Sequence, residues 1–76
     1  MRKNIKTLAK ELEVVDYCEY VMFAAVNGQW GSVTELVNEM RKDDLRGFAY
    51  MIWCGNYDTF SNRIQGDVLR EVLNAI

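Results

Sequence analysis

The stretch "AAVNGQWGSVTELVNEM", residues 24–40, decides how this chain folds. Its first apolar run ends at an Asn-Gly pair, where the glycine can adopt the left-handed conformation that closes a helix. Asn-Gly also marks β-hairpins, but the flanking segments have a helical period and not an alternating one. Four apolar residues after the pair follow the i, i+3, i+4, i+7 spacing of one side of a helix: Val33, Leu36, Val37 and Met40. The stretch therefore predicts two helices joined by a tight turn.

Local signals place the ends of the neighbouring helices. Ser32 and Glu35 have the spacing of a capping box, which predicts that the second helix of the pair begins there. Either Asp43 or Asp44 can cap a third helix, which should run as far as Gly55. The chain contains no proline, so nothing in its composition interrupts helices along its length.

The two ends of the chain are less clearly marked. Asp58 or Thr59 should start a fourth segment. The Gly-Asp pair at 66–67 either bends that segment or ends it before a last helix, "VLREVLNAI", residues 68–76. At the front, "NIKTLAKEL", residues 4–12, has the pattern of a short helix.

A faint internal repeat suggests how the helices are arranged. Shifting the chain by 27 residues superposes Trp30 on Tyr57 and Val33 on Phe60, each pair following a glycine turn. Two helical hairpins of similar build can each cover the apolar side of the other. We therefore expect an all-α fold: a single domain, 1–76, of four to five short helices, arranged as two stacked helical hairpins plus a C-terminal helix packed across them. The basic segment 1–10 is expected as a short helix or a frayed end.

The apolar stripes of these segments define the expected core. The segment around residues 45–54 is apolar nearly all round, which is typical of a central helix, and Trp53 is expected inside the fold. Gly47 weakens this helix and could allow a neighbour to approach closely. The expected core residues are Leu12, Val14, Cys18, Val21, Ala25, Val33, Leu36, Val37, Leu45, Phe48, Ala49, Ile52, Phe60, Ile64, Val68 and Leu69.

Residues 21–38 resemble the helical pair of an ankyrin repeat, in which two alanines precede an Asn-Gly turn and a second helix rich in valine and leucine follows. The matching positions are Ala24, Ala25, Asn27, Gly28, Val33, Leu36 and Val37. The Thr-Pro-Leu-His opening of that family is absent from this chain. The resemblance implies two short antiparallel helices packed on each other.

The composition excludes several kinds of chemistry. The chain contains no histidine, so the usual Ser-His and Cys-His nucleophile arrangements cannot be built. Its two cysteines, Cys18 and Cys54, are far apart and do not form a zinc-binding pattern. The acidic residues have the spacing of helix surfaces and caps and not of a catalytic pair in a cleft. We therefore expect no enzyme activity, no cofactor and no metal.

The same sequence indicates where the protein works. Both cysteines lie in apolar stretches, which favours buried, reduced thiols in a cytoplasmic protein over one disulfide in an exported protein. The basic N-terminal residues are not followed by the apolar core of a signal peptide. The longest apolar run, "YVMFAAV", is far too short to span a bilayer. No membrane partner is expected.

Charge is segregated along the chain. The first ten residues are basic, whereas residues 11–39 contain six acids and no base. At about 100° per residue, an acidic and aromatic set falls on one side of its helix: Asp16, Glu19, Tyr20 and Phe23. This side is either a solvated face, with Phe23 tucked under the N-terminal segment, or a patch that docks on a basic protein surface.

The candidate partner-binding residues extend beyond that helix. Trp30 lies in the turn, where it either packs over the ends of both helices or is presented to a partner. Glu35 and Glu39 add acidic groups on the following helix. The full candidate set is Asp16, Glu19, Tyr20, Phe23, Trp30, Glu35 and Glu39.

Two functions fit these features. The first is a non-enzymatic protein-binding module whose acidic and aromatic surface binds a larger protein or protein complex that has a basic surface. Small, acidic, motif-free helical proteins are frequent among phage and mobile-element products that inhibit host machinery, so an inhibitor of a nucleic-acid-handling complex is its most concrete form. The alternative is a DNA-binding helix-turn-helix regulator, against which stand the acidic balance of the chain and of its recognition helix. The apolar residues of "EVLNAI", 71–76, could also pair two copies as a homodimer.

Overall fold

Five helices account for most of the chain in the computed structural model, which describes residues 2–76. They are α1 (Ile5–Leu12), α2 (Tyr17–Val26), α3 (Trp30–Asn38), α4 (Lys42–Trp53) and α5 (Asn62–Ala75). Apart from them, Lys3 and Met40 form one isolated parallel bridge, and residues 2–76 contain no strand. The predicted all-α fold class is confirmed.

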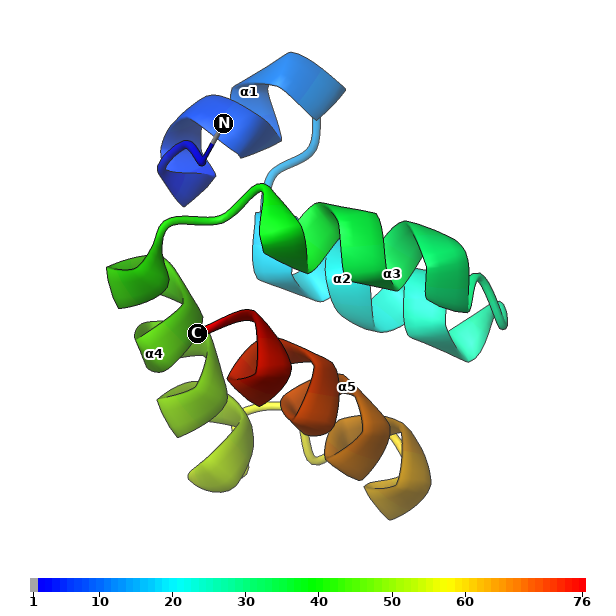
Figure 1. Cartoon of the computed structure of the whole chain (residues 1–76). Coiled ribbons are helices and arrows are strands. Elements are labelled where there is room, and N and C mark those ends of the chain that lie inside the picture. Colours follow the sequence, from blue (N-terminus) through cyan, green and yellow to red (C-terminus); the bar gives the residue numbers. More distant parts are fainter. Residues whose placement is uncertain (1) are drawn as a thin grey trace.

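The helices form two hairpins, α2–α3 and α4–α5, with α1 lying on the first of them (Figure 1). Within each hairpin the two helices pack along each other, and α5 also contacts both α2 and α3. The stacked hairpins therefore agree with the expected architecture. The last helix is not an additional element packed across them, because it is itself the second arm of the α4–α5 hairpin.

The α2–α3 hairpin closes with a very short turn over residues 27–29. Gly28 has φ 74°, the left-handed conformation expected of this glycine. The amide of Gln29 then donates to the carbonyl of Ala24 at 3.0 Å, so the chain has already reversed when α3 begins at Trp30. The predicted helix start at the Ser32–Glu35 capping box is wrong, because the turn delivers the backbone into the helix two residues earlier.

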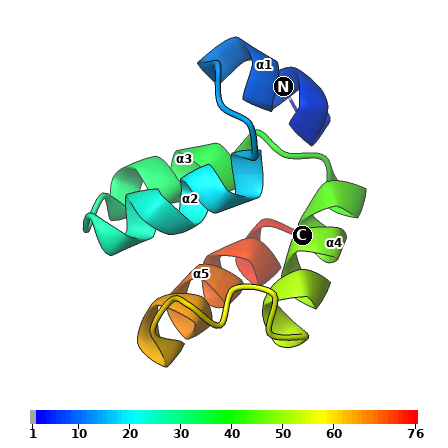
Figure 2. The same cartoon turned by 180° about the vertical axis from the view of Figure 1, so that it is seen from behind.

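The α4–α5 hairpin has a longer connection, residues 54–61, seen from behind in Figure 2. Gly55 has φ 86° after α4 ends, and Ser61 caps α5 by accepting a hydrogen bond from the amide of Ile64 at 3.2 Å. The predicted starts at Asp58 or Thr59 are therefore wrong. Between the glycine and the cap, the chain instead turns Tyr57 and Phe60 toward the protein interior.

The start of α4 and the course of α5 also differ from expectation. Arg41 occupies the cap position of α4 and makes no side-chain cap bond, so neither Asp43 nor Asp44 caps this helix. Asp44 instead accepts a hydrogen bond from the amide of Ile5 at 3.0 Å, which joins α4 to the start of α1. α5 continues through Gly66 without a break, because its buried stripe holds the helix against three neighbours.

Residues 2–5 hold the joint between the two hairpins. The amide of Lys3 donates to the carbonyl of Glu39 at 2.8 Å, and the amide of Arg41 donates to the carbonyl of Lys3 at 3.2 Å. The guanidinium of Arg2 donates to the carbonyl of Met40 and, at 2.8 Å, to that of Ala75. We call this set of contacts the N-terminal clamp.

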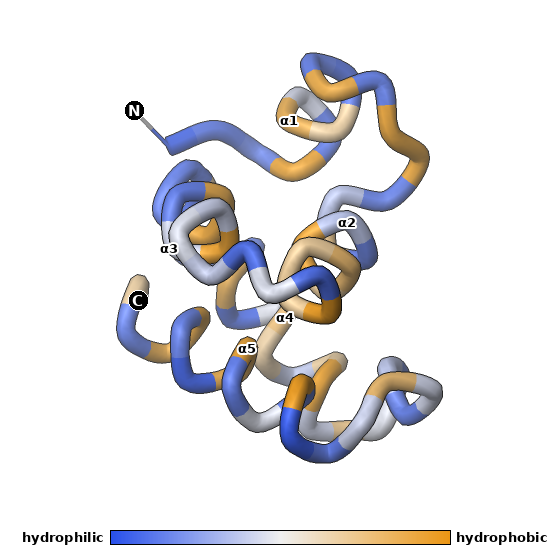
Figure 3. Tube along the Cα trace, turned by 90° about the vertical axis from the view of Figure 1, so that its right-hand side faces the viewer, coloured by the Kyte–Doolittle hydropathy of each residue, from blue (hydrophilic) through white to orange (hydrophobic). Residues whose placement is uncertain are grey.

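The core lies where the two hairpins meet, and apolar stretches of α2 and α4 gather there in Figure 3. Most predicted core residues are buried or packed against it. The prediction is wrong for Leu12, Val14 and Trp53, which lie outside the core. Leu12 is 42% exposed and Trp53 is 80% exposed. Leu12 is the last residue of α1, and Trp53 is the last residue of α4, the helix that packs on α5. Buried residues that the sequence pattern missed include Tyr17, Met22, Met40, Tyr57 and Val72.

Candidate protein-docking face

The exposed side of α2 carries four of the candidate residues. Asp16 caps the helix, because its carboxylate accepts from the amide of Glu19 at 3.1 Å. The buried side of α2 faces the core, so Glu19, Tyr20 and Phe23 point outward. The sequence period therefore assigned these side chains to the correct side of the helix.

Two aromatic rings lie half-exposed among these charges. Tyr20 is 41% exposed and Phe23 is 51% exposed. Phe23 makes an edge-to-face contact with Phe60, with ring centroids 5.3 Å apart, so it packs on the α4–α5 connection. The expectation that Phe23 lies under the N-terminal segment is wrong, because α1 covers the opposite end of α2.

A groove separates α1 from α3 and has an apolar floor with an acidic rim. Its volume is about 160 Å³, and Leu8, Leu12, Tyr17 and Leu36 form its apolar walls. The Tyr17 hydroxyl donates to the carbonyl of Leu36 at 2.8 Å, which fixes the ring between the two helices. The carboxylates around it belong to Glu11, Glu35 and Glu39.

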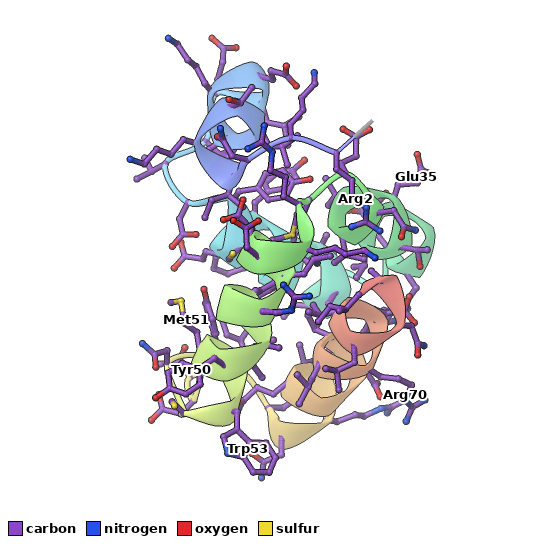
Figure 4. The ribbon with its side chains drawn as sticks, turned by 60° about the vertical axis from the view of Figure 1, so that its left-hand side comes forward. Arg2, Glu35, Tyr50, Met51, Trp53 and Arg70 are labelled. Carbon is purple, nitrogen blue, oxygen red and sulfur yellow. The ribbon has the colours of Figure 1, made fainter. Side chains whose placement is uncertain are left out.

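A second groove continues this surface between α2 and α3. Its volume is about 170 Å³, and it shares Glu35 and Leu36 with the first groove. Tyr20, Ala24, Gln29 and Ser32 form the rest of its lining. Figure 4 shows Glu35 projecting from α3. We call the two grooves and the exposed side of α2 the acidic face.

The acidic groups of this face mostly lack intramolecular cations. Within residues 2–76 the ion pairs are Lys3–Glu11 at 2.7 Å and Arg63–Asp67 at 3.9 Å. The carboxylates of Asp16, Glu19, Glu35 and Glu39 belong to neither pair. The charges of Glu19, Glu35 and Glu39 are therefore available to attract a cationic partner, whereas the Asp16 carboxylate also caps α2.

The negative potential reaches into the first groove. Burial is the main cause that raises the pKa of Tyr17, and the nearby carboxylates of Glu39 and Glu11 raise it further. A hydrogen bond to Glu11, together with its charge, raises the pKa of Lys3. A Lys or Arg side chain entering the groove would lay its aliphatic stem on the floor and its charge against the rim.

Trp30 stands apart from the other candidate residues. It is half-buried, packs against the core and borders a shallow depression formed with Asp67, Arg70 and Glu71 of α5. The nearby Thr34 hydroxyl donates to the Glu71 carboxylate at 2.9 Å, which ties this side of α3 to α5. Trp30 therefore occupies the packing position that the sequence offered as one alternative, and it lies on another side of α3 from Glu35.

Glu11, Leu12 and Leu36 are among the residues that the structure brings into this face and that the sequence interpretation did not include. Leu12 and Leu36 were assigned to the core because they continue apolar stripes. Leu12 is exposed because α1 stops there, with Glu13 following in the left-handed conformation at φ 57°. Only the position of α1 over α3, a contact distant in sequence, could reveal the groove.

Both cysteines are free thiols, Cys18 buried and Cys54 exposed. Burial raises the pKa of the Cys18 thiol to about 12, and the nearby carboxylates of Asp16 and Asp44 raise it further. A thiol of this kind stays protonated and inert near neutral pH. No cluster of three or more metal-ligating side chains occurs among residues 2–76.

None of the helices in the described part of the chain combines the length and the apolarity needed to cross a membrane. Comparisons with protein-family models, with curated proteins and with solved structures find no match for this chain. The ankyrin-like character of residues 21–38 therefore stays a prediction.

Proposed function

We propose that this chain is a non-enzymatic protein-binding module that docks its acidic face on a basic surface of a larger protein. One observation carries the proposal: Glu35 and Glu39, which belong to no intramolecular ion pair, line grooves with an apolar floor and a half-exposed tyrosine. Asp16 and Glu19, which also lack an intramolecular cation, are exposed on the neighbouring helix α2. Carboxylates that stabilise a fold through ion pairs are expected to have cations within it, and these have none, although Asp16 also caps α2.

The mixture of residues on the face favours protein docking over simple solvation. Aromatic side chains such as Tyr20 and Phe23 are enriched at the centres of protein interfaces, where they bury large areas. Charges around such a centre mainly increase the rate of association and select the partner. A partner surface that normally holds phosphates has the matching charge, so an inhibitor of a nucleic-acid-handling complex is the most specific form of this proposal.

The alternative function, a DNA-binding regulator, has less support. In a helix-turn-helix arrangement α3 would enter the major groove, where cations are needed to neutralise phosphates. Glu35 on α3 and Glu39 directly after it are exposed and would repel the phosphates instead. No basic patch accompanies them on the acidic face.

The test reverses two charges of the acidic face that do not cap a helix. A Glu19→Lys/Glu35→Lys variant is compared with wild type and with an Asp58→Lys/Asp67→Lys control, which changes the net charge equally on other surfaces. Each chain is immobilised and used to recover proteins from cells of the native host. We expect one partner that binds wild type and control, is lost from the acidic-face variant, and dissociates as salt rises to about 0.5 M.

Two results would overturn the proposal. The first is a set of recovered proteins that is the same for all three chains while circular dichroism shows that each is folded. The second is retardation of duplex DNA by the wild-type chain at physiological salt, which would replace the protein-binding module with the DNA-binding regulator.

A further inference from the structure

The first groove, between α1 and α3, gathers negative charge where the fold itself does not favour it. Glu35 and Glu39 both line the groove, and they are one helical turn apart because the amide of Glu39 donates to the carbonyl of Glu35 at 3.2 Å. Like charges at this spacing destabilise a helix, and so does negative charge at its carboxyl end. The last turn of α3 contains no basic residue, so nothing within the helix offsets either effect.

One lysine of the chain already lies at the rim of this groove. The ammonium of Lys3 bonds to Glu11 at 2.7 Å, and the amide of Lys3 donates to the carbonyl of Glu39 at 2.8 Å. The hydrogen bond to Glu11 is the main cause that raises the pKa of Lys3, and the charge of Glu39 adds to it. The rim therefore attracts a cation, and Lys3 satisfies only the carboxylate on α1. Glu35 and Glu39 belong to no ion pair within residues 2–76.

The other basic side chain of the N-terminal clamp does not supply the missing charge. Figure 4 labels both Arg2 and Glu35, but the guanidinium of Arg2 donates to the carbonyls of Met40 and Ala75. No basic residue is among those that line the groove. The groove therefore keeps two carboxylates for a cation from outside the chain.

The shape of the groove limits what can enter it. Its volume is about 160 Å³, which is room for one long side chain and not for a helix or a strand. Leu12 and Leu36 offer apolar surface to an aliphatic stem. The floor is fixed in advance, because Tyr17 is buried and its hydroxyl donates to the carbonyl of Leu36 at 2.8 Å.

We propose that the first groove holds one arginine side chain of the partner protein, with the guanidinium between Glu35 and Glu39. The stem lies on Leu12 and Leu36, and the positive charge offsets both the like-charge pair and the carboxyl end of α3. This inference rests on the proposed function, because it names the group that the acidic face takes from its partner.

Arginine fits this place better than lysine. Residues one helical turn apart have Cβ atoms about 6 Å apart, and a guanidinium has N–H donors on several edges, so one group can bond to both carboxylates. A guanidinium is also more weakly hydrated than an ammonium, so it loses less hydration on entering a groove. A lysine would bring a point charge to one carboxylate, as Lys3 does at Glu11.

The first experiment titrates the isotope-labelled protein with short glycine-serine peptides that carry a single arginine, lysine or citrulline. Citrulline has the shape of arginine without its charge. We expect the arginine peptide to shift the amide signals of Leu12, Leu36 and Glu39 saturably, with a dissociation constant on the order of 1 mM. The lysine peptide should bind about threefold more weakly and the citrulline peptide about tenfold more weakly. Nuclear Overhauser contacts should join the arginine methylene protons to the methyl groups of Leu12 and Leu36.

The second experiment removes the charges and keeps the shape of the groove. A Glu35→Gln/Glu39→Gln variant should bind the arginine peptide about tenfold more weakly than wild type. Its thermal midpoint should be equal or higher, because the like-charge pair is gone. Asp58→Asn/Asp67→Asn is the matched control: it removes the same charge from other surfaces and should leave the affinity unchanged.

Several results would overturn the inference. They are the absence of saturable shifts with the arginine peptide, binding of the citrulline or lysine peptide as tight as that of arginine, and an unchanged affinity of the Glu35→Gln/Glu39→Gln variant. Failure here is distinct from failure of the proposed function. If the peptides fail while a host protein still binds wild type and is lost from Glu19→Lys/Glu35→Lys, the docking module stands and the arginine does not.

Discussion

The two hairpins use the same signal to end their first helix and then differ completely. Both place a glycine in the left-handed conformation, Gly28 at φ 74° and Gly55 at φ 86°. After Gly28 the chain re-enters a helix at once. After Gly55 it takes a longer path, on which Tyr57 packs edge-to-face on Phe48 at 5.7 Å and Phe60 reaches Phe23 of the other hairpin.

This difference shows that a connection can be part of the core. The α2–α3 turn only reverses the chain, so the stability of its hairpin comes from helix packing. The α4–α5 connection adds two aromatic side chains, one of which joins the hairpins directly. The hairpin with the longer connection should therefore be the more sensitive to changes in the side chains that meet it.

The largest expected effect is at Phe48, which is 1% exposed and contacts the connection through Tyr57. Phe48→Ala should lower the free energy of unfolding by about 3–5 kcal/mol, because it leaves a cavity and removes the aromatic contact. Met22→Ala, at a fully buried position of the α2–α3 hairpin, is the matched change, and we expect a smaller loss. Urea denaturation measures both. An equal or larger loss at Met22 would contradict the special role of the connection.

Alkaline pH should destabilise the protein, because it deprotonates a buried thiol in one hairpin and a buried tyrosine hydroxyl in the other. Burial raises the pKa of Cys18 from 9.0 to about 12, and it also raises the pKa of Tyr57. The folded state therefore holds protons that the unfolded state has already lost. Stability should be complete below pH 9 and fall as pH rises from 9 to 12, by up to about 1.4 kcal/mol per pH unit for each group.

Variants at Cys18 and Tyr57 separate the contributions of the two groups to this loss of stability. Urea denaturation at pH 8, 9.5 and 11 should show a shallower fall for Cys18→Ala and, above pH 10, for Tyr57→Phe. A wild-type stability that is constant between pH 9 and 11 would show that neither group is protected from water.

The two turn glycines should respond alike in spite of the different connections. Gly28→Ala and Gly55→Ala each force an alanine into the left-handed region, so each should lower stability by about 1–2 kcal/mol. Gly31→Ala, in a right-handed helical position with open space around it, should not destabilise the protein. A loss confined to Gly28 would mean that the longer connection can relax around its glycine.

The smallest effect is expected at the Tyr57 hydroxyl. This oxygen is buried without a hydrogen-bond partner. At neutral pH, Tyr57→Phe should leave the thermal stability unchanged or raise it by up to about 1 kcal/mol, because it removes an unsatisfied polar group. A clear loss of stability would show that the hydroxyl has a partner, for which the adjacent Cys18 thiol is the candidate.

Periodicity was enough to predict the helical fold, the hairpins and most of the core. Periodicity did not predict where a helix begins when several nearby residues could cap it equally well. Asp58, Thr59 and Ser61 are all good cap residues, and the packing of Tyr57 and Phe60 selects Ser61. Trp53 continues the apolar pattern of α4, but it is the last residue of that helix and no other helix covers its side chain. Such choices depend on contacts distant in sequence.

The candidate surface was predictable only helix by helix. The side of α2 that bears Glu19 and Phe23 followed from the helical period. The first groove did not, because it needs α1 to lie beside α3, and no local pattern specifies this. For Trp30 the sequence left two alternatives, packing over the helix ends or presentation to a partner, and its contact with the core agrees with the packing alternative.

The N-terminal clamp has a consequence for motion. The α3–α4 joint is a short irregular segment of the kind that often acts as a hinge, but Arg2 and Lys3 bond to both of its sides. The hairpins can swing apart only if these bonds break together, so the Arg41 amide should exchange with deuterium as slowly as amides within the helices. A partner would then meet a preformed rigid body, and little conformational entropy would be lost on binding.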